Sequence, residues 1–209
     1  MRNLLIGLVI LMAGGLAQGG AYDDIVAAAN NGDTNTVLDL LKRGMDVNTA
    51  DRSGSTLLMI ATRNGNMPLL ESLLANRANV NRRNQHGDTA LMLAALKARQ
   101  DAVRALIASA ADLNPSGWTP LHYAIYGGNR EIAALLIAKG AKLDSQAPNG
   151  QTALMLAVKL GKADLVHLLI EADADMDVAD YEGVSALRLA RKLGHEEIAQ
   201  YLRKVGAVE

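Results

Sequence analysis

Residues 117–124 read Gly117-Trp118-Thr119-Pro120-Leu121-His122-Tyr123-Ala124, and the pattern of this stretch returns along the whole chain. A glycine followed seven residues later by an alanine occurs with spacings of 33, 30, 33 and 33 residues, at Gly54, Gly87, Gly117, Gly150 and Gly183. Ala28 marks an additional earlier unit, and twelve residues after each of the six alanines comes a leucine: Leu40, Leu73, Leu106, Leu136, Leu169 and Leu202. The chain is therefore a repeat array.

Each unit consists of a turn, a short helix, a second turn and a longer helix, as in residues 150–157 followed by residues 164–170. Apolar residues at helical spacing face both neighbours, so a single unit cannot bury them and adjacent units must stack. We predict an all-α fold of about six helix pairs, with approximate bounds 22–48, 49–81, 82–114, 115–144, 145–177 and 178–209.

These residues resemble the ankyrin repeat. The resemblance is plainest in residues 117–124 and in the helix endings at residues 44–48 and 140–144, and it covers about 190 residues. It implies an α-solenoid in which short β-hairpin-like turns join the helix pairs. The first unit and the polar last unit are expected to act as caps, because the outer face of a terminal repeat meets water.

The units depart from the family pattern where the second helix ends. Gly44, Gly140 and Gly206 stand at a position that favours a left-handed backbone, but three other units have a side chain there, at Arg77, Ala110 and Asp173. We expect strain at those three ends, since only glycine adopts that conformation freely. The connection at residues 113–117 is three residues short, so one hairpin is expected to be truncated, with either a bend or a trimmed loop as the result.

Residues 1–21 differ from the rest, with a basic start, an apolar run over residues 4–13 and then small residues. The run is about half the roughly twenty residues that a bilayer span needs, which favours a secretory signal peptide, cleaved after Ala17 or Ala21. The chain has no cysteine to mispair in an oxidising compartment. We expect a periplasmic or secreted protein without stable membrane insertion; the alternative is a membrane-tethered adaptor that keeps this segment as an anchor.

Three motifs resemble chemical sites but lack essential parts. Residues 195–199 begin like a zinc-protease helix, yet Ala199 stands where the second histidine ligand belongs. Residues 173–177 resemble the start of a calcium loop, yet Val178 takes the place of its required glycine. His122 is expected to bond the backbone at a helix start. We therefore expect no enzyme activity, no metal and no cofactor, and a hydrolase built on turn histidines and carboxylates is an alternative.

The remaining candidate for a functional site is the surface of the protein. With 21 Lys plus Arg against 22 Asp plus Glu, the near-neutral chain is not expected to bind nucleic acid. The ankyrin resemblance implies a concave face that holds a partner protein, and it places there Arg52, Arg63, Leu96, Lys97, Trp118, Tyr126, Lys159, Leu160 and Tyr181. We expect a monomer in which central apolar residues anchor the partner and basic residues flank them. The alternative for these positions is an ordinary solvated surface.

Overall fold

The structure is a computed structural model that describes residues 14–208, with side chains from residue 20 onward. The described part of the chain divides into two compact units, with the boundary between Gly87 and Asp88. Helices α1–α4 belong to the first unit and helices α5–α12 to the second. The fold is all-α, as predicted, and the only β-structure in the described part consists of isolated bridges.

The first unit contains two helix pairs, α1 (Gly14–Asn30) with α2 (Thr34–Lys42) and α3 (Leu57–Asn64) with α4 (Met67–Ala75). Helix α1 packs on α3, and α2 packs on α4, so the two pairs stack. Helix α1 begins before the predicted repeat boundary at Tyr22. The predicted signal peptide, residues 1–21, lies largely outside the described residues and stays a prediction.

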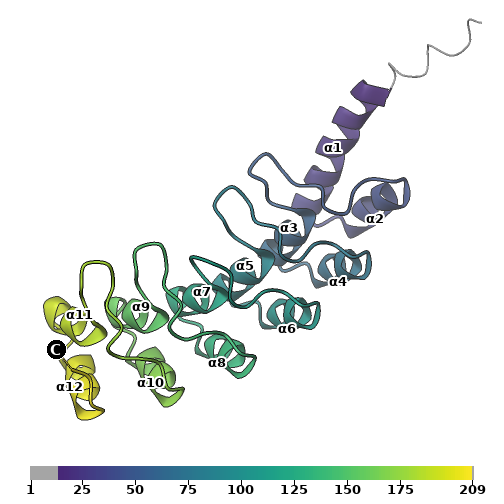
Figure 1. Cartoon of the computed structure of the whole chain (residues 1–209). Coiled ribbons are helices and arrows are strands. Elements are labelled where there is room, and N and C mark those ends of the chain that lie inside the picture. Colours follow the sequence, from purple (N-terminus) through teal and green to yellow (C-terminus); the bar gives the residue numbers. More distant parts are fainter. Residues whose placement is uncertain (1–13, 209) are drawn as a thin grey trace, which may run out of the picture. The chain divides into compact units, whose positions relative to one another are not determined.

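The second unit contains four helix pairs: α5 (Ala90–Leu96) with α6 (Gln100–Ala108), α7 (Pro120–Gly127) with α8 (Arg130–Ala138), α9 (Ala153–Lys159) with α10 (Ala163–Glu171), and α11 (Ala186–Leu193) with α12 (Glu196–Lys204). Figure 1 shows α5, α7, α9 and α11 side by side in one layer and α6, α8, α10 and α12 in a second. In every pair of either unit, we call the first helix the inner helix and the second the outer helix. Loops that project from one side join each outer helix to the next inner helix (Figure 1).

The inner helices of repeats two to six begin at a hydroxyl residue. The side chains of Thr56, Thr89, Thr119, Thr152 and Ser185 each accept a hydrogen bond from the backbone N–H three residues later. Such a cap satisfies a helix donor that would otherwise have no partner, and it contributes about 1 kcal/mol. Isolated bridges from Ala50 to Thr56 and from Ala179 to Ser185 make the preceding turns hairpin-like, as predicted.

The repeated leucine position fills the core. Leu73, Leu106, Leu136, Leu169 and Leu202 are 0% exposed, and Leu40 is also buried. These side chains are among the buried residues of the outer helices. The sequence-based assignment of this position to the core is therefore confirmed.

The predicted left-handed helix ends are also confirmed, since φ is 60° at Arg77, 61° at Ala110 and 67° at Asp173. A fourth such residue, Ala98 with φ of 55°, was missed. It ends an inner helix at the position where the neighbouring repeats have Gly65 or Gly128, so the repeat alignment contained the signal. Among the described residues, four that are not glycine thus adopt a conformation that favours glycine.

The short connection before α7 trims a loop and keeps the bond between repeats. Asn114 Oδ1 accepts from the Lys142 N–H at 2.7 Å, and Asn114 Nδ2 donates to the Gly140 carbonyl at 3.0 Å. The equivalent Asp144 Oδ1 accepts from the Asp175 N–H at 2.9 Å one repeat further on. The three-residue deletion therefore leaves this inter-repeat link unchanged.

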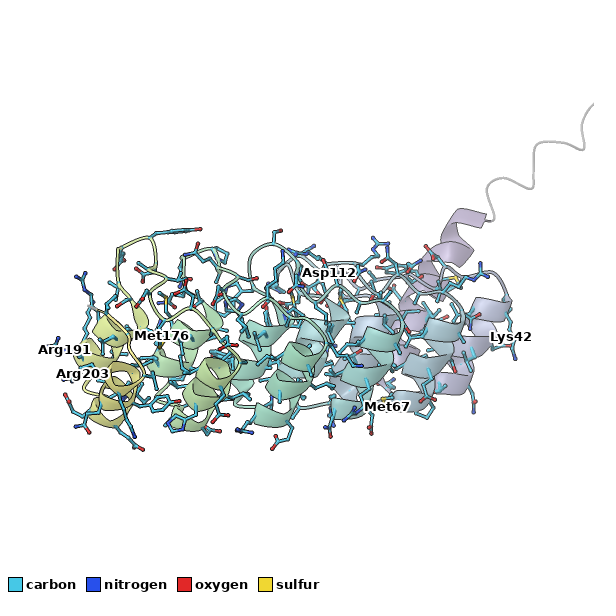
Figure 2. All side chains as sticks on the ribbon, turned by 60° about the horizontal axis from the view of Figure 1, so that its bottom comes forward. Lys42, Met67, Asp112, Met176, Arg191 and Arg203 are labelled. Carbon is cyan, nitrogen blue, oxygen red and sulfur yellow. The ribbon has the colours of Figure 1, made fainter. Side chains whose placement is uncertain are left out.

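The last helix pair has the polar outer face expected of a cap. Figure 2 shows Arg191 of α11 and Arg203 of α12 at the end of the second unit, pointing away from the other helix pairs of that unit. The labelled Asp112 lies among the loops (Figure 2). None of the helices in the described residues is both long and apolar enough to cross a membrane.

Candidate protein-binding site

An apolar pocket of about 210 Å³ lies in the second unit and is lined by Leu96, Trp118, Tyr123 and Tyr126. Leu96 is the last residue of α5, Trp118 precedes the cap of α7, and both tyrosines lie on α7. The structure thus brings together three of the predicted binding residues from two repeats. Tyr123 was missed, although it lies one helical turn before Tyr126 and hence on the same side of the helix.

Contacts between aromatic rings fix the position of the lining residue Trp118. The Trp118 ring meets the His122 ring edge to face, with centroids 5.4 Å apart, and the Tyr123 ring in the same manner at 6.1 Å. The Tyr123 hydroxyl donates to Asp88 Oδ1 in the preceding repeat. T-shaped pairs of this kind are favourable, so Trp118 is held in place although it is partly exposed.

His122, whose ring contacts the lining residue Trp118, is 1% exposed. Its Nδ1 accepts from the Thr119 N–H at 3.3 Å, as predicted, and its Nε2 lies 3.2 Å from the carbonyl of Gln151 in the next repeat. Burial lowers the pKa of His122, and the bond to Gln151 offsets this only in part. The ring is therefore neutral at pH 7, with Nε2–H donating, and it links two repeats.

Asn129 fixes the two helices that form the walls. Its Nδ2 donates to the Ala95 carbonyl at 2.7 Å, and Asn129 is itself the N-cap of α8. The end of α5, with Leu96, is thereby tied to the end of α7, with Tyr126. The pocket is preformed by contacts within the chain.

The other predicted binding residues do not line this pocket, and their role in binding stays a prediction. Lys97 and Lys159 are exposed at the ends of α5 and α9, and Leu160, 37% exposed, follows Lys159 outside the lining of the pocket. Tyr181, 72% exposed, lies at a hairpin tip with its ring against Gly150.

Arg52 and Arg63 belong to the first unit, and both are exposed. Arg63 Nη2 donates to Asn30 Oδ1 at 3.2 Å within that unit.

The motifs that resembled chemical sites serve the fold. His195 stands at the N-cap position of α12, where its side chain makes no capping hydrogen bond. Asp175 Oδ1 accepts from the Asp177 N–H at 2.9 Å, and Asp177 Oδ1 accepts from the Val208 N–H at 3.1 Å, so both carboxylates order turns. Among the described residues no three His, Asp or Glu side chains are placed to hold a metal ion. His167 of α10 stacks on Tyr201 of α12 with ring centroids 4.0 Å apart.

Comparison with known proteins agrees with the repeat pattern. A family model described as ankyrin repeats, three copies, matches residues 25–116, 68–147 and 139–208. A search of curated proteins found no match. Among solved structures, the chain is similar to one from the complex of Bd0816, a predatory endopeptidase of Bdellovibrio bacteriovorus, with the immunity protein Bd3460. That similarity has a TM-score of 0.77 and 28% identity, over 87% of this chain and 97% of the other. The matches extend over most of the sequence, and the chain therefore belongs to the ankyrin-repeat family.

Proposed function

We propose that this protein is a non-catalytic binding module that holds a partner protein at the pocket of Leu96, Trp118, Tyr123 and Tyr126. The observation that carries the proposal is a preformed apolar pocket whose most exposed lining residue, Tyr126, is 59% exposed. Tyr and Trp are enriched among the residues that dominate protein interfaces. A surface already ordered by its own contacts loses little entropy on binding, which favours tight association.

We further propose that the partner is an endopeptidase and that binding inhibits it. Support comes from the similar solved structure, in which an immunity protein is bound to an endopeptidase. An inhibitor needs only a surface that covers the partner, so the proposal requires no catalytic residue in this chain. The same comparison disfavours the hydrolase alternative.

Export completes the proposal. The apolar run and small residues at the N-terminus support a cleaved signal peptide and a periplasmic or secreted protein. The intact mass of protein purified from its native host tests this directly: loss of 17 or 21 residues supports export, whereas a full-length mass supports the tethered alternative.

The binding proposal is tested with the double variant Trp118→Ala, Tyr126→Ala. The partner is first identified by crosslinked pull-down from the native compartment, and its peptidase activity is then titrated with the purified protein. Truncation of one hot-spot residue costs about 2 kcal/mol or more, so even if only one of the two residues is a hot spot we expect inhibition to weaken at least about 30-fold.

Tyr201→Ala is the matched control, because it removes a tyrosine from the outer helix α12. This variant should inhibit like the wild type. Circular dichroism must show that every variant is folded. Full inhibition by the double variant, or its unfolding, would contradict the assigned site.

A further inference from the structure

Three of the four inner helices of the second unit, α5, α9 and α11, end in segments that carry positive charge and no negative charge, and the segment after α7 is uncharged. Residues 94–99, 124–129, 157–162 and 190–195 contain six Lys or Arg and no Asp or Glu. Residues 88–209 as a whole contain 13 basic and 15 acidic residues, so this excess is local. We call five of these cations the basic row: Lys97, Arg99, Lys159, Lys162 and Lys192. The sixth, Arg191, already has a partner within the chain.

The basic row is available to an external anion. Lys97, Arg99, Lys159 and Lys192 are exposed, and Lys162 is half-buried. Within the described part of the chain, none of the five forms an ion pair. Unpaired surface cations attract acidic partners and raise the association rate.

The ammonium group of Lys162 lies at the C-terminal end of α7, the helix that carries Tyr123 and Tyr126 of the pocket. Its Nζ lies so close to Gly128 that a Cβ at that glycine would overlap it. Gly128 is the left-handed cap of α7 and lies two residues beyond Tyr126. Lys97, on the other side, directly follows the lining residue Leu96. Cations therefore flank the pocket from both neighbouring repeats.

Packed helices lie roughly 8–10 Å apart, and an extended chain advances about 3.3 Å per residue. A strand that crosses the inner helices therefore meets a new helix about every third residue. We infer that the pocket and the basic row together bind one extended acidic segment of the partner protein, with an apolar anchor in the pocket and carboxylates about three residues apart on either side. This inference rests on the proposed function and adds the chemistry of the bound segment.

The charges beside the basic row favour a narrow segment over a broad polyanion. Asp101, Glu131, Asp164 and Glu197 lie in the first turns of the outer helices, where negative charge complements the helix dipole. A nucleic acid or an anionic membrane surface would face this acidic row as well as the basic one. A single extended peptide need contact only the basic row.

The test uses a fluorescent peptide of about 13 residues with one central leucine, glutamates three and six positions away on both sides, and serine or glycine elsewhere. The control peptide has glutamine in place of every glutamate. In anisotropy titrations at low salt, we expect the acidic peptide to bind at least about tenfold more tightly. The preference should shrink as salt rises, since charges more than about 8 Å apart are screened at 0.15 M.

Two pairs of substitutions locate the binding. Lys159→Glu with Lys162→Glu should abolish the preference for the acidic peptide. Lys139→Glu with Lys204→Glu makes the same change in net charge at the ends of the outer helices α8 and α12, and it should leave the preference for the acidic peptide intact. Trp118→Ala with Tyr126→Ala should weaken the binding of both peptides, because the central leucine of each peptide loses its pocket.

The inference is overturned if the acidic peptide does not bind at roughly 1 mM, if both peptides bind equally, or if the outer-helix control loses as much as the row variant. It is also overturned if oligothymidylate or phosphatidylglycerol vesicles bind as tightly and ignore the pocket substitutions. If the peptide tests fail while the pocket variant still loses peptidase inhibition, the proposed function stands and only the acidic segment is rejected.

Discussion

Ala110→Gly should stabilise this protein, although glycine usually weakens a fold. Ala110 is exposed and has φ of 61° at the end of α6. An L residue in the left-handed region loses about 1–2 kcal/mol relative to its preferred conformations. Glycine avoids this penalty, but its greater conformational freedom stabilises the unfolded chain by about 0.4–1 kcal/mol. The net gain is roughly 0.5–1 kcal/mol, which corresponds to a rise in Tm of about 1–4 °C for a chain of this size.

The matched control is Ala108→Gly, two residues earlier. Ala108 is also exposed, but it is the last residue of α6 and has a helical backbone. Glycine there should lower stability by up to about 1 kcal/mol, because the helix loses its best-forming residue. Both variants replace one alanine by glycine, and we expect opposite changes in their free energies of unfolding.

Urea and thermal denaturation followed by circular dichroism measure both variants against the wild type. A rise for Ala110→Gly together with a fall for Ala108→Gly supports the reasoning. Clear destabilisation by Ala110→Gly would refute the claim that strain at this helix end limits stability. Ala98→Gly, at the end of α5, repeats the test at the helix end that the sequence analysis missed.

Three further outcomes are expected. Leu106→Ala should cost about 2–5 kcal/mol in urea denaturation, against about 0.5 kcal/mol or less for His195→Ala in the terminal repeat; equal losses would contradict the core assignment. Thr152→Ala removes the cap of α9 and should cost about 1 kcal/mol; no change in the urea midpoint would show the cap to be dispensable. His122→Gln should flatten the loss of stability between about pH 7 and 5, because the lowered folded-state pKa leaves proton uptake near 6.5 to the unfolded chain; an unchanged pH profile would count against this assignment.

The repeated core and helix starts were predictable because each depends on a local pattern. A buried leucine such as Leu106 follows from helical spacing, and a cap such as Thr119 follows from one hydroxyl and one backbone N–H three residues away. In a repeat protein every unit contacts only its neighbours, so a local rule applied at each period yields the fold. The left-handed ends at Arg77 and Asp173 followed from the same alignment.

The candidate site was only half predictable. Alignment placed Leu96, Trp118 and Tyr126 on the same face, and the structure brings them together in one pocket. Leu160 was expected beside them and lies outside the lining. The spacing of Tyr123 to Tyr126 within one helix could have added it to the site, but its bond to Asp88, 35 residues earlier in the chain, could not have been predicted. That contact depends on how two repeats pack, and no spacing within one repeat reports it.

The sequence by itself determined the period, the helix pairs, the buried leucines and the terminal cap, because these follow from nearest-neighbour rules repeated along a nearly one-dimensional array. Only the tertiary structure decided which side chains meet across repeats. It directed His122 to the Gln151 carbonyl, Asn129 to the Ala95 carbonyl and Lys162 to Gly128. The physical reason is that side-chain direction depends on the backbone and on packed neighbours, and these are set only when the adjacent repeat is in place.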